Sequence, residues 1–317
     1  MHKITHLTAA IALAIAPVLL AAPARAVLLN HTWVASNGDD SKSCDRPTPC
    51  ATFSGANSKT ANHGEITCVD SGTYGGLFIT GSITINCENA IGSISPAGAG
   101  ASGIIINTVA TDVVVLRGLD LDGFGIVAGS LITFTGAGAL HLHKVKLNAA
   151  AIGISFNPTG GGKLFVSDCT ITDHVGSGGV SAGILIRPEA NVTAQVSIIR
   201  TQIENNFYGI FADGTSGGTI GGVVRDSVVS GNVNIGITVA ASSTSVVLLV
   251  DNTTVANNNY GMAAVGTGAG LAVGRSSIIF NNTGLFTATG GVLGSYKNNN
   301  VGGNGVDGMF TVFAGLQ

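Results

Sequence analysis

Two aspartates two residues apart are the strongest pair of candidate acid–base groups in the chain. Asp120 and Asp122 alternate in "GLDLDG", so in an extended strand both point the same way, about 6.5–7 Å apart. Two carboxyl groups at that separation can protonate a leaving oxygen and activate a water. Lys146, one repeat later, would lie beside Asp120. A solvated polar strand face accounts for the same residues and is favoured, because the equivalent positions of later repeats are mostly uncharged.

Other candidate groups are more scattered. His141 and His143 alternate in "LHLHKVK", a spacing at which two imidazoles can share a metal, but no third ligand accompanies them. We therefore predict no metal site. His174, Arg187 and Glu189 lie in or beside insertions of the longest repeat. That repeat is expected to bulge outward, so these three are weak candidates for binding.

Five cysteines could form two disulfides. Cys44 and Cys50 flank the loop "CDRPTPC" and could close it, whereas Cys68 and Cys87 lie in successive strand-like runs and could join neighbouring repeats. Cys169 is left over in the apolar setting "FVSDCTIT". We interpret it as a buried, inert thiol rather than a nucleophile.

The first residues have the pattern of an export signal. Lys3 precedes an apolar run from Thr8 to Ala22, and Ala24-Arg25-Ala26 is a small-residue cleavage motif. This predicts a signal peptide over residues 1–26 and a secreted or periplasmic protein. A membrane anchor is the alternative, but the run is short for a span, and no later stretch is long and apolar enough for one.

Composition restricts the class of protein and of partner. The chain has 47 glycines, 45% hydrophobic residues and only 10% charged residues. A disordered chain needs more charge and less apolar content, so a packed, glycine-rich, β-rich protein is predicted. The net charge of −3 argues against a nucleic-acid partner, because phosphate binding needs clustered Lys and Arg.

An internal repeat of about 25 residues is the dominant feature. Glycine followed by Ile, Met or Leu recurs at Gly125, Gly153, Gly183, Gly209, Gly236, Gly261 and Gly284. An apolar row keeps step with it at Leu121, Leu147, Ile171, Ile203, Val229, Val255 and Ile279. The leucine-rich repeat pattern is absent, and Val, Ile and Thr alternate with period two between Gly and Asn breaks. The pattern predicts a parallel β-helix whose coils stack about 4.8 Å apart.

Aligning the repeats on this row places a charged corner outside the coil. Two inward columns lie five and two residues before the row, the last coil contributing Gly274 and Ser277. Between them are two consecutive polar columns, and one of these alternates in sign through Lys144, Asp168 and Arg200. We expect such residues to neutralise each other from coil to coil rather than to catalyse. Exposed pairs of this kind contribute about 0–1 kcal/mol each.

A second corner is expected where paired asparagines precede the repeated glycine, as in Asn205-Asn206 and Asn281-Asn282. Asparagine tolerates left-handed backbone, and stacked amides can hydrogen-bond from coil to coil. The glycine is expected to permit the turn into the next strand. A sugar or calcium site built from these amides is the less favoured alternative.

Both ends of such a solenoid need covering. At the N-terminal end, Thr48 is predicted to cap a short helix with Pro49 in its first turn and Gly64 at its end. Cys50, Phe53 and Ala56 would form its buried side. Apolar residues of the C-terminal tail are expected to cover the other end: Met309, Phe310, Val312 and Phe313. The predicted organisation is a signal peptide (1–26), a cap region (27–64), coils (65–300) and a C-terminal cap (301–317).

The block from Thr32 to Gly76 and the N-x-x-G-I corners carry a resemblance to a known group. They resemble exported bacterial right-handed parallel β-helix repeat proteins of the pectin-lyase-like superfamily, over nearly the whole mature chain. The resemblance implies an all-β right-handed parallel β-helix with a short N-terminal helical cap. It implies little about activity, because the group includes lyases, hydrolases and esterases of acidic polysaccharides as well as passenger domains of surface proteins.

The family's catalytic motifs N-T-D, G-H-G and R-I-K are absent, so no catalytic residue is carried over from the resemblance. A lyase of this kind would need several carboxylates for calcium and an Arg or Lys base. No cofactor is therefore predicted, calcium being expected only if the protein is a lyase. Aromatic residues make up 5% of the chain, with Trp33 the single tryptophan, which also weakens the enzyme hypothesis.

Two functional hypotheses follow. The favoured one is a secreted or periplasmic structural or surface-binding module whose partner is a polysaccharide or the cell envelope. The rival is a carbohydrate-active enzyme, a polysaccharide lyase or glycoside hydrolase, that acts on acidic polysaccharide through Asp120, Asp122 and Lys146. The sequence carries no signal for an oligomeric state.

Overall fold

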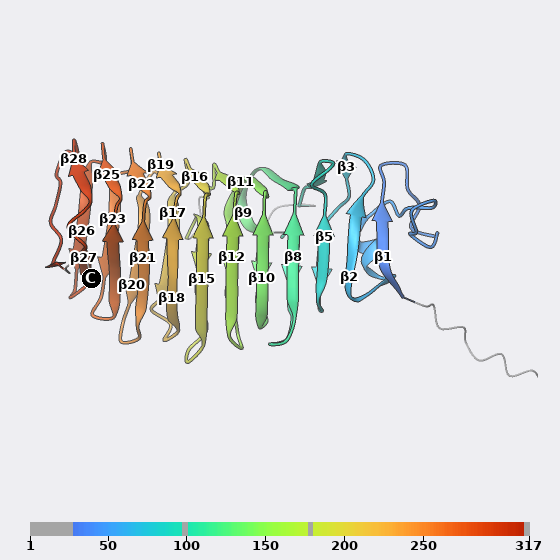
Figure 1. The fold of residues 1–317 in the computed structure, drawn as a ribbon, viewed down its shortest axis with the longest axis horizontal. Helices are drawn as coiled ribbons and strands as arrows, with labels where there is room; N and C mark the ends of the chain where they lie inside the picture. Colours follow the sequence, from blue (N-terminus) through green and yellow to red (C-terminus); the bar gives the residue numbers. More distant parts are fainter. Residues whose placement is uncertain (1–27, 97–100, 177–179, 314–317) are drawn as a thin grey trace, which may run out of the picture.

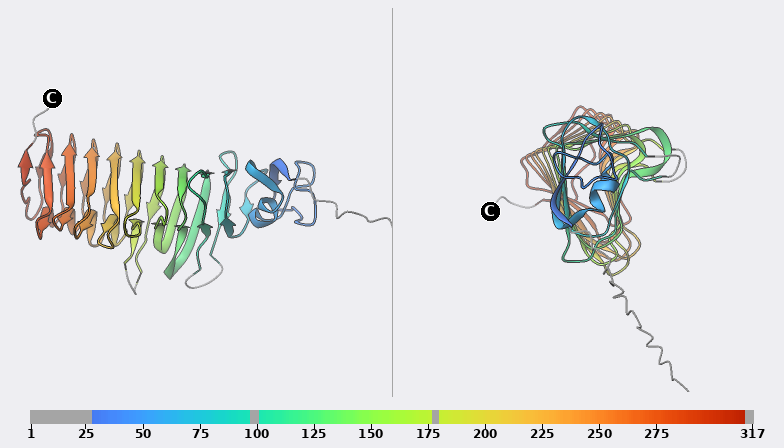
Figure 2. Two further views of the ribbon diagram at one scale, coloured as in Figure 1. Left: turned by 90° about the horizontal axis from the view of Figure 1, so that it is seen from below. Right: turned by 90° about the vertical axis from the view of Figure 1, so that its right-hand side faces the viewer.

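The chain winds into a parallel β-solenoid, which confirms the right-handed parallel β-helix predicted from the sequence. The structure is a computed structural model that describes residues 28–96, 101–176 and 180–313 (Figure 1). The predicted signal peptide, residues 1–26, lies outside the described residues. Strands of successive coils lie side by side along one long axis (Figures 1 and 2). No helix among the described residues is long and apolar enough to cross a bilayer.

One face of the solenoid, called the A face, is a 12-stranded parallel sheet. Its strands, in spatial order, are β1 (Leu29–Val34), β2 (Thr60–Cys68), β5 (Ile83–Asn86), β8 (Val113–Arg117), β10 (Gly138–His143), β12 (Gly162–Ser167), β15 (Thr193–Ile199), β18 (Thr219–Arg225), β21 (Val246–Asp251), β24 (Ala269–Gly274), β27 (Val292–Ser295) and β29 (Val312–Phe313).

The B face consists of short strands that follow the A face in each coil. They are β3 (Gly72–Thr73), β6 (Gly92–Ile94), β13 (Thr170–Thr172), β16 (Gln202–Glu204), β19 (Val228–Ser230), β22 (Thr254–Ala256), β25 (Ser277–Ile279) and β28 (Asn300–Gly302). The long strands β9 (Leu119–Phe134) and β11 (Lys146–Phe156) begin on the B face and continue onto the third face.

The third face is called the C face. Its strands are β4 (Leu77–Ile79), β7 (Ile104–Ile106), β14 (Ala182–Ile186), β17 (Tyr208–Gly214), β20 (Ile235–Ala241), β23 (Tyr260–Val265) and β26 (Thr283–Ala288). All pairings on the three faces are parallel, and one buried apolar cluster runs along the inside from Val34 to Leu293. Burial of inward Val, Ile and Leu therefore holds the coils together.

The predicted apolar row is confirmed except at its last position. Leu147 pairs with Leu121 and Ile171, and the row continues in register to Val255. Val255 pairs with Ile278, not with Ile279. The sequence contains two adjacent isoleucines here, and the prediction of Ile279, the outward one, is wrong. The same one-residue shift replaces the predicted inward Gly274 and Ser277 with Val273 and Ser276, both buried.

The N-terminal helix exists but is shorter than predicted. Helix α1 spans Phe53–Asn57, and its N-cap is Thr52, whose hydroxyl accepts from the Gly55 N–H at 2.9 Å. Thr48 instead bonds to Asp45 inside the disulfide-closed loop. The chain is still extended at Cys50, which bridges to β1, so the helix cannot start there. Phe53 and Ala56 are fully buried as expected, and the helix ends before Gly64, which belongs to β2.

The C-terminal tail covers its end of the solenoid only in part. Phe310 packs against the core, whereas Met309 is 83% exposed and Phe313 60% exposed. Val312 adds a short strand beside β27 but remains half exposed. The expectation that all four apolar residues of the tail cover the last coil is therefore wrong for three of them.

The cysteine predictions are confirmed. Cys44 is disulfide-bonded to Cys50, and Cys68 to Cys87. Cys169 is a buried free thiol whose pKa is raised to about 11, chiefly by burial. Its sulfur accepts the Val145 N–H of the preceding coil at 3.4 Å. Two disulfides are typical of proteins from an oxidising, extracytoplasmic compartment.

Candidate functional site

The predicted acid pair lies where the sequence placed it, on the outer side of the B face. Lys146 pairs in register with Asp120, and Asn148 with Asp122. Asp120 and Lys146 are nonetheless not within ion-pair distance among the contacts of the described residues.

Both carboxylate oxygens of Asp122 already have hydrogen-bond donors. One accepts the Phe124 N–H at 2.7 Å, and the other accepts the Asn148 amide at 3.2 Å. The Thr172 hydroxyl donates to Asn148 in turn, at 3.1 Å. Asp122 thus terminates a hydrogen-bonded column that crosses three coils. A carboxylate held in this way is better suited to fastening the coils than to taking a proton from a substrate.

The two alternating histidines have separate environments. His141 stacks on Phe165 on the A face, with ring centroids 4.3 Å apart. Burial, and secondarily the charge of Arg117, lowers the pKa of His141. His143 lies at the charged corner, 3.5 Å from a Glu88 oxygen and 3.3 Å from an Asp168 oxygen. No group of three or more His, Cys, Asp or Glu side chains suited to a metal occurs among the described residues.

The three weak binding candidates do not come together. His174 is completely buried, so its predicted position on an outward bulge is wrong. Arg187 forms an ion pair with the buried Asp213 at 2.8 Å, which holds two adjacent coils of the C face together. Glu189 is exposed in the turn that follows β14.

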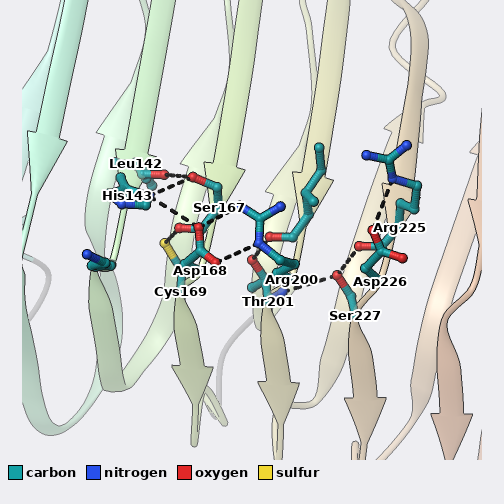
Figure 3. Close-up of polar contacts among 12 residues, drawn as sticks. Leu142, His143, Ser167, Asp168, Cys169, Arg200, Thr201, Arg225, Asp226 and Ser227 are labelled. Carbon is teal, nitrogen blue, oxygen red and sulfur yellow. Dashed lines mark hydrogen bonds and ion pairs between the residues drawn. The ribbon is translucent and has the colours of Figure 1, made fainter.

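The charged corner joins the A face to the B face, as Figure 3 shows. Arg200 forms two hydrogen bonds to the Asp168 carboxylate, at 2.7 and 2.8 Å. These bonds are the largest cause of the lowered pKa of Asp168. Lys144 reaches Glu88 at 3.1 Å, and Arg225 reaches Asp226 at 3.2 Å. The predicted neutralisation along the corner is confirmed for Asp168 with Arg200, although Lys144 pairs with Glu88 instead of Asp168.

The same corner has left-handed backbone in seven successive coils. Its residues have φ between +46° and +63°: Gly118, Lys144, Asp168, Arg200, Asp226, Asn252 and Arg275. Each amide from Gly118 to Asn252 donates to a carbonyl of the next coil, at 3.1–3.2 Å. The one-residue shift at the β24 coil puts Arg275 here, where it pairs with Asp251. The sequence pattern predicted a polar corner here, but it did not show that these residues all adopt the same left-handed turn.

A trough on the A face has the dimensions to hold an extended ligand. Three adjoining depressions of about 430, 400 and 370 Å³ follow the starts of the A-face strands. The first two share Thr111 and Asp112, and the second and third share Thr193 and Gln195. They run from β2 to β18, a length of about 29 Å at the usual strand spacing. Sequence reasoning missed this trough, because its lining comes from separate coils. One outward row of it consists of Val113, Ala139, Lys163, Gln195 and Gly221.

The chemistry of the trough is neutral. Its polar wall consists of amides and hydroxyls: Asn57, Thr60, Asn62, Thr80, Ser82, Thr111, Thr193, Gln195, Ser197 and Thr219. Lys163 is the one cation in this lining, and Asp112 is the one carboxylate. Asp112 is 7% exposed and accepts from the Ser82 hydroxyl at 2.8 Å and the Val109 N–H at 3.1 Å. Phe165, 37% exposed, adds an aromatic ring near one end.

Comparison with known proteins confirms the fold. No protein-family model matches the chain, and no curated protein matches it. Among solved structures, a rhamnogalacturonan lyase aligns with a TM-score of 0.55 and 11% identity, over 78% of this chain and 73% of the lyase. The pectate lyase Pel9A aligns with a TM-score of 0.47 and 13% identity, over 84% of this chain and 67% of the lyase. The first likeness shows a shared parallel β-helix architecture.

Proposed function

We propose that the protein is an exported, non-catalytic glycan-binding module that holds an extended, largely uncharged polysaccharide in the A-face trough. The observation that carries the proposal is the lining of this trough. It is long enough for a polymer, and it combines amides and hydroxyls with small residues such as Ala139 and Gly221 and one aromatic ring. Such a mixture matches a chain of sugar hydroxyls with apolar ring faces.

The charge of the trough supports a neutral ligand over an acidic one. A polyanion is held by several cations, and Lys163 is the one that the described lining provides. The cations at the corner are already paired with Glu88, Asp168 and Asp251. The proposed ligand is therefore a neutral polymer, whereas the ligand of the rival hypothesis is an acidic polysaccharide.

The lining also supports binding over hydrolysis. Hydrolysis of a glycosidic bond uses two carboxyl groups beside the bond. In the trough, Asp112 is buried and its oxygens are occupied. Asp120, Asp122 and Lys146 are not among the residues that line it.

Gly221 offers a direct test of the trough. A Cβ on this outward glycine of β18 would have no atom within 4 Å, so a larger side chain can project into the trough without disturbing the coil. Affinity gel electrophoresis should show binding of the wild type to neutral polymers such as hydroxyethylcellulose and xylan. Gly221→Leu should weaken this binding tenfold or more.

Gly302 supplies the matched control. It lies in β28 on the B face, away from the trough, and a Cβ there would likewise meet no atom within 4 Å. Gly302→Leu should bind as the wild type does. Equal binding by all three proteins would refute the proposal that the polymer binds in the trough. Release of unsaturated or reducing ends from pectin or alginate, abolished by Asp122→Ala, would establish the enzyme hypothesis instead.

A further inference from the structure

Five aromatic side chains gather on the outside of the C face, away from the A-face trough. Phe207, Tyr208 and Phe211 belong to the coil of β17, with the Tyr208 ring 5.0 Å from Phe207 and 4.9 Å from Phe211. Two strands further along, the Tyr260 ring on β23 lies 5.2 Å from the Phe286 ring on β26. Phe286 is 39% exposed, and the other four are half-buried.

Small residues lie between the two ring groups. Strand β20 lies between β17 and β23 and places Thr238 beside Phe211, while Ala263 of β23 pairs with Phe286. Thr238 and Ala263 occupy outward positions yet are 3% and 0% exposed. Their burial shows that the larger side chains around them cover these small residues.

The border of this surface is mostly polar and uncharged, although Arg187 and the buried Asp213 form an ion pair beside the β17 rings. Asn259 and Asn282 are exposed beside the rings, and the Asn282 amide donates to Asn259 at 3.1 Å. The Tyr260 hydroxyl has no hydrogen-bond partner among the described residues. The strands β20, β23 and β26 contain no charged residue.

We propose that this C-face aromatic surface is a second binding site for neutral polysaccharide. Aromatic rings offer apolar area at low entropic cost, and tyrosine adds a polar tip. The neighbouring amides can exchange hydrogen bonds with sugar hydroxyls. An acidic polymer or a nucleic acid would find no cation on these strands, and stable membrane binding usually adds basic residues to the apolar ones.

The two sites lie on different faces of the same solenoid. Binding of a polymer at both sites would raise the overall affinity by multivalency. The inference goes beyond the proposed function and shares only its ligand class. The double variant Tyr260→Ala/Phe286→Ala removes one ring pair. We expect it to weaken binding to hydroxyethylcellulose about tenfold in affinity electrophoresis, and adding Gly221→Leu should weaken binding further.

Control variants separate ring loss from misfolding. Tyr296→Ala removes a partly exposed tyrosine elsewhere and should leave affinity unchanged. Tyr260→Phe/Phe286→Tyr keeps both rings and should retain binding within about twofold. A double alanine variant that melts like the wild type and binds with wild-type affinity would overturn the inference, as would binding of phosphatidylcholine vesicles or polygalacturonate in preference to the neutral polymer.

The two proposals fail in different ways. If Gly221→Leu abolishes binding and the aromatic variant changes nothing, the second site is refuted and the trough stands. If the aromatic variant alone loses affinity, the trough is refuted and the C face is the glycan site. A wild-type protein that binds no polymer in the panel refutes both.

Discussion

Asn206 donates two hydrogen bonds to one oxygen of Asn232, in the next coil. The backbone N–H of Asn206 lies 3.0 Å from Asn232 Oδ1, and its side-chain amide lies 3.1 Å from it. Asn232 repeats both bonds to Asn258, at 2.9 and 2.8 Å. The predicted ladder is thus confirmed, with Asn281 and Asn304 as its later members. The pair predicted as Asn281-Asn282 is Phe280-Asn281, because the register shifts by one residue in the coil of β24 and β25.

Asn232→Ala should lower the free energy of unfolding by about 2–4 kcal/mol, because it removes the acceptor of two buried donors of Asn206. Urea denaturation followed by circular dichroism would measure this loss. Asn257, the exposed member of a neighbouring pair, has φ of +57°. Asn257→Gly should change stability little, because glycine accepts this backbone conformation. Equal effects of the two substitutions would contradict a structural ladder.

His174 occupies the ladder position in the coil before Asn206. Its backbone N–H donates to Asn206 Oδ1 at 3.1 Å. In the Nε2–H tautomer, Nδ1 accepts the Ala150 N–H and Nε2–H donates to the Leu147 carbonyl. In the other tautomer, Nδ1–H donates to the Ala150 carbonyl at 3.2 Å. Burial lowers the pKa of His174 to about 4. The folded protein therefore favours the neutral ring.

This pKa makes stability depend on pH with a defined sign. Between about pH 6.5 and pH 4 the unfolded state binds a proton that the folded state does not, so acidification destabilises the fold by about 3 kcal/mol and then levels off. His174→Asn should remove this component in urea titrations at successive pH values. The Asn257→Gly variant changes no titratable group, so it is the control and should keep the wild-type profile.

The sequence was sufficient for the fold because inward residues repeat in every coil. Leu121, Leu147 and Ile171 indicate the register directly, and the cysteine spacing indicates both disulfides. The predicted register is wrong only where Ile278 and Ile279 are equally apolar. There the period alone could not choose between them.

The surfaces proposed for binding were less accessible to sequence reasoning. The trough depends on register, which places residues of different coils, such as Lys163, Gln195 and Gly221, side by side. In a turn-rich chain most glycines are expected simply to permit turns. The aromatic surface depends on contacts between coils, such as that of Tyr260 with Phe286. The low aromatic content of the whole chain gave no indication that five aromatic residues lie together on the C face.

Arg200 tests whether the charged corner is held by its ion pair or by its backbone turn. Its guanidinium is exposed, so the pair with Asp168 should contribute at most about 1 kcal/mol. Its φ of +49° costs a comparable amount for any residue but glycine. Arg200→Gly should therefore remain within about 1 kcal/mol of the wild type, and Arg200→Ala should be less stable than Arg200→Gly.

Acid weakens this corner for a different reason from that at His174. At the corner, protonation removes the charge of Asp168, whereas at His174 the unfolded state takes up the proton. Arg200 holds the pKa of Asp168 below its usual value, so the pair stabilises the fold above about pH 4 and the contribution is lost as the pH falls through the lowered pKa. Both Arg200 variants should lose this component in urea titrations. A glycine variant less stable than the alanine variant would show that the turn imposes no strain.

The repeated glycine of the C-face strands has a different role from the one predicted, except at Gly125, whose φ of +75° is left-handed. Gly209 does not have a positive φ, so it is not needed for the turn. A Cβ at this position would lie 2.5 Å from the Gly236 carbonyl oxygen and 3.0 Å from the Asn232 amide nitrogen. Gly236 and Gly261 meet the same obstacle in the following coils. The glycine is therefore required by the close approach of the next coil and its ladder.

Gly209→Ala and Gly221→Ala form a matched pair that isolates this packing effect. Both glycines lie in parallel strands with ordinary backbone angles, so the gain in chain entropy from alanine is similar. At Gly221 the Cβ meets nothing within 4 Å, and stability should rise by about 0.5–1 kcal/mol. At Gly209 the coils must separate, and stability should fall by about 1–3 kcal/mol. Thermal denaturation of the two variants would show opposite shifts. Shifts of one sign would mean that the coils adjust freely, and the stacked ladder would then not fix their spacing.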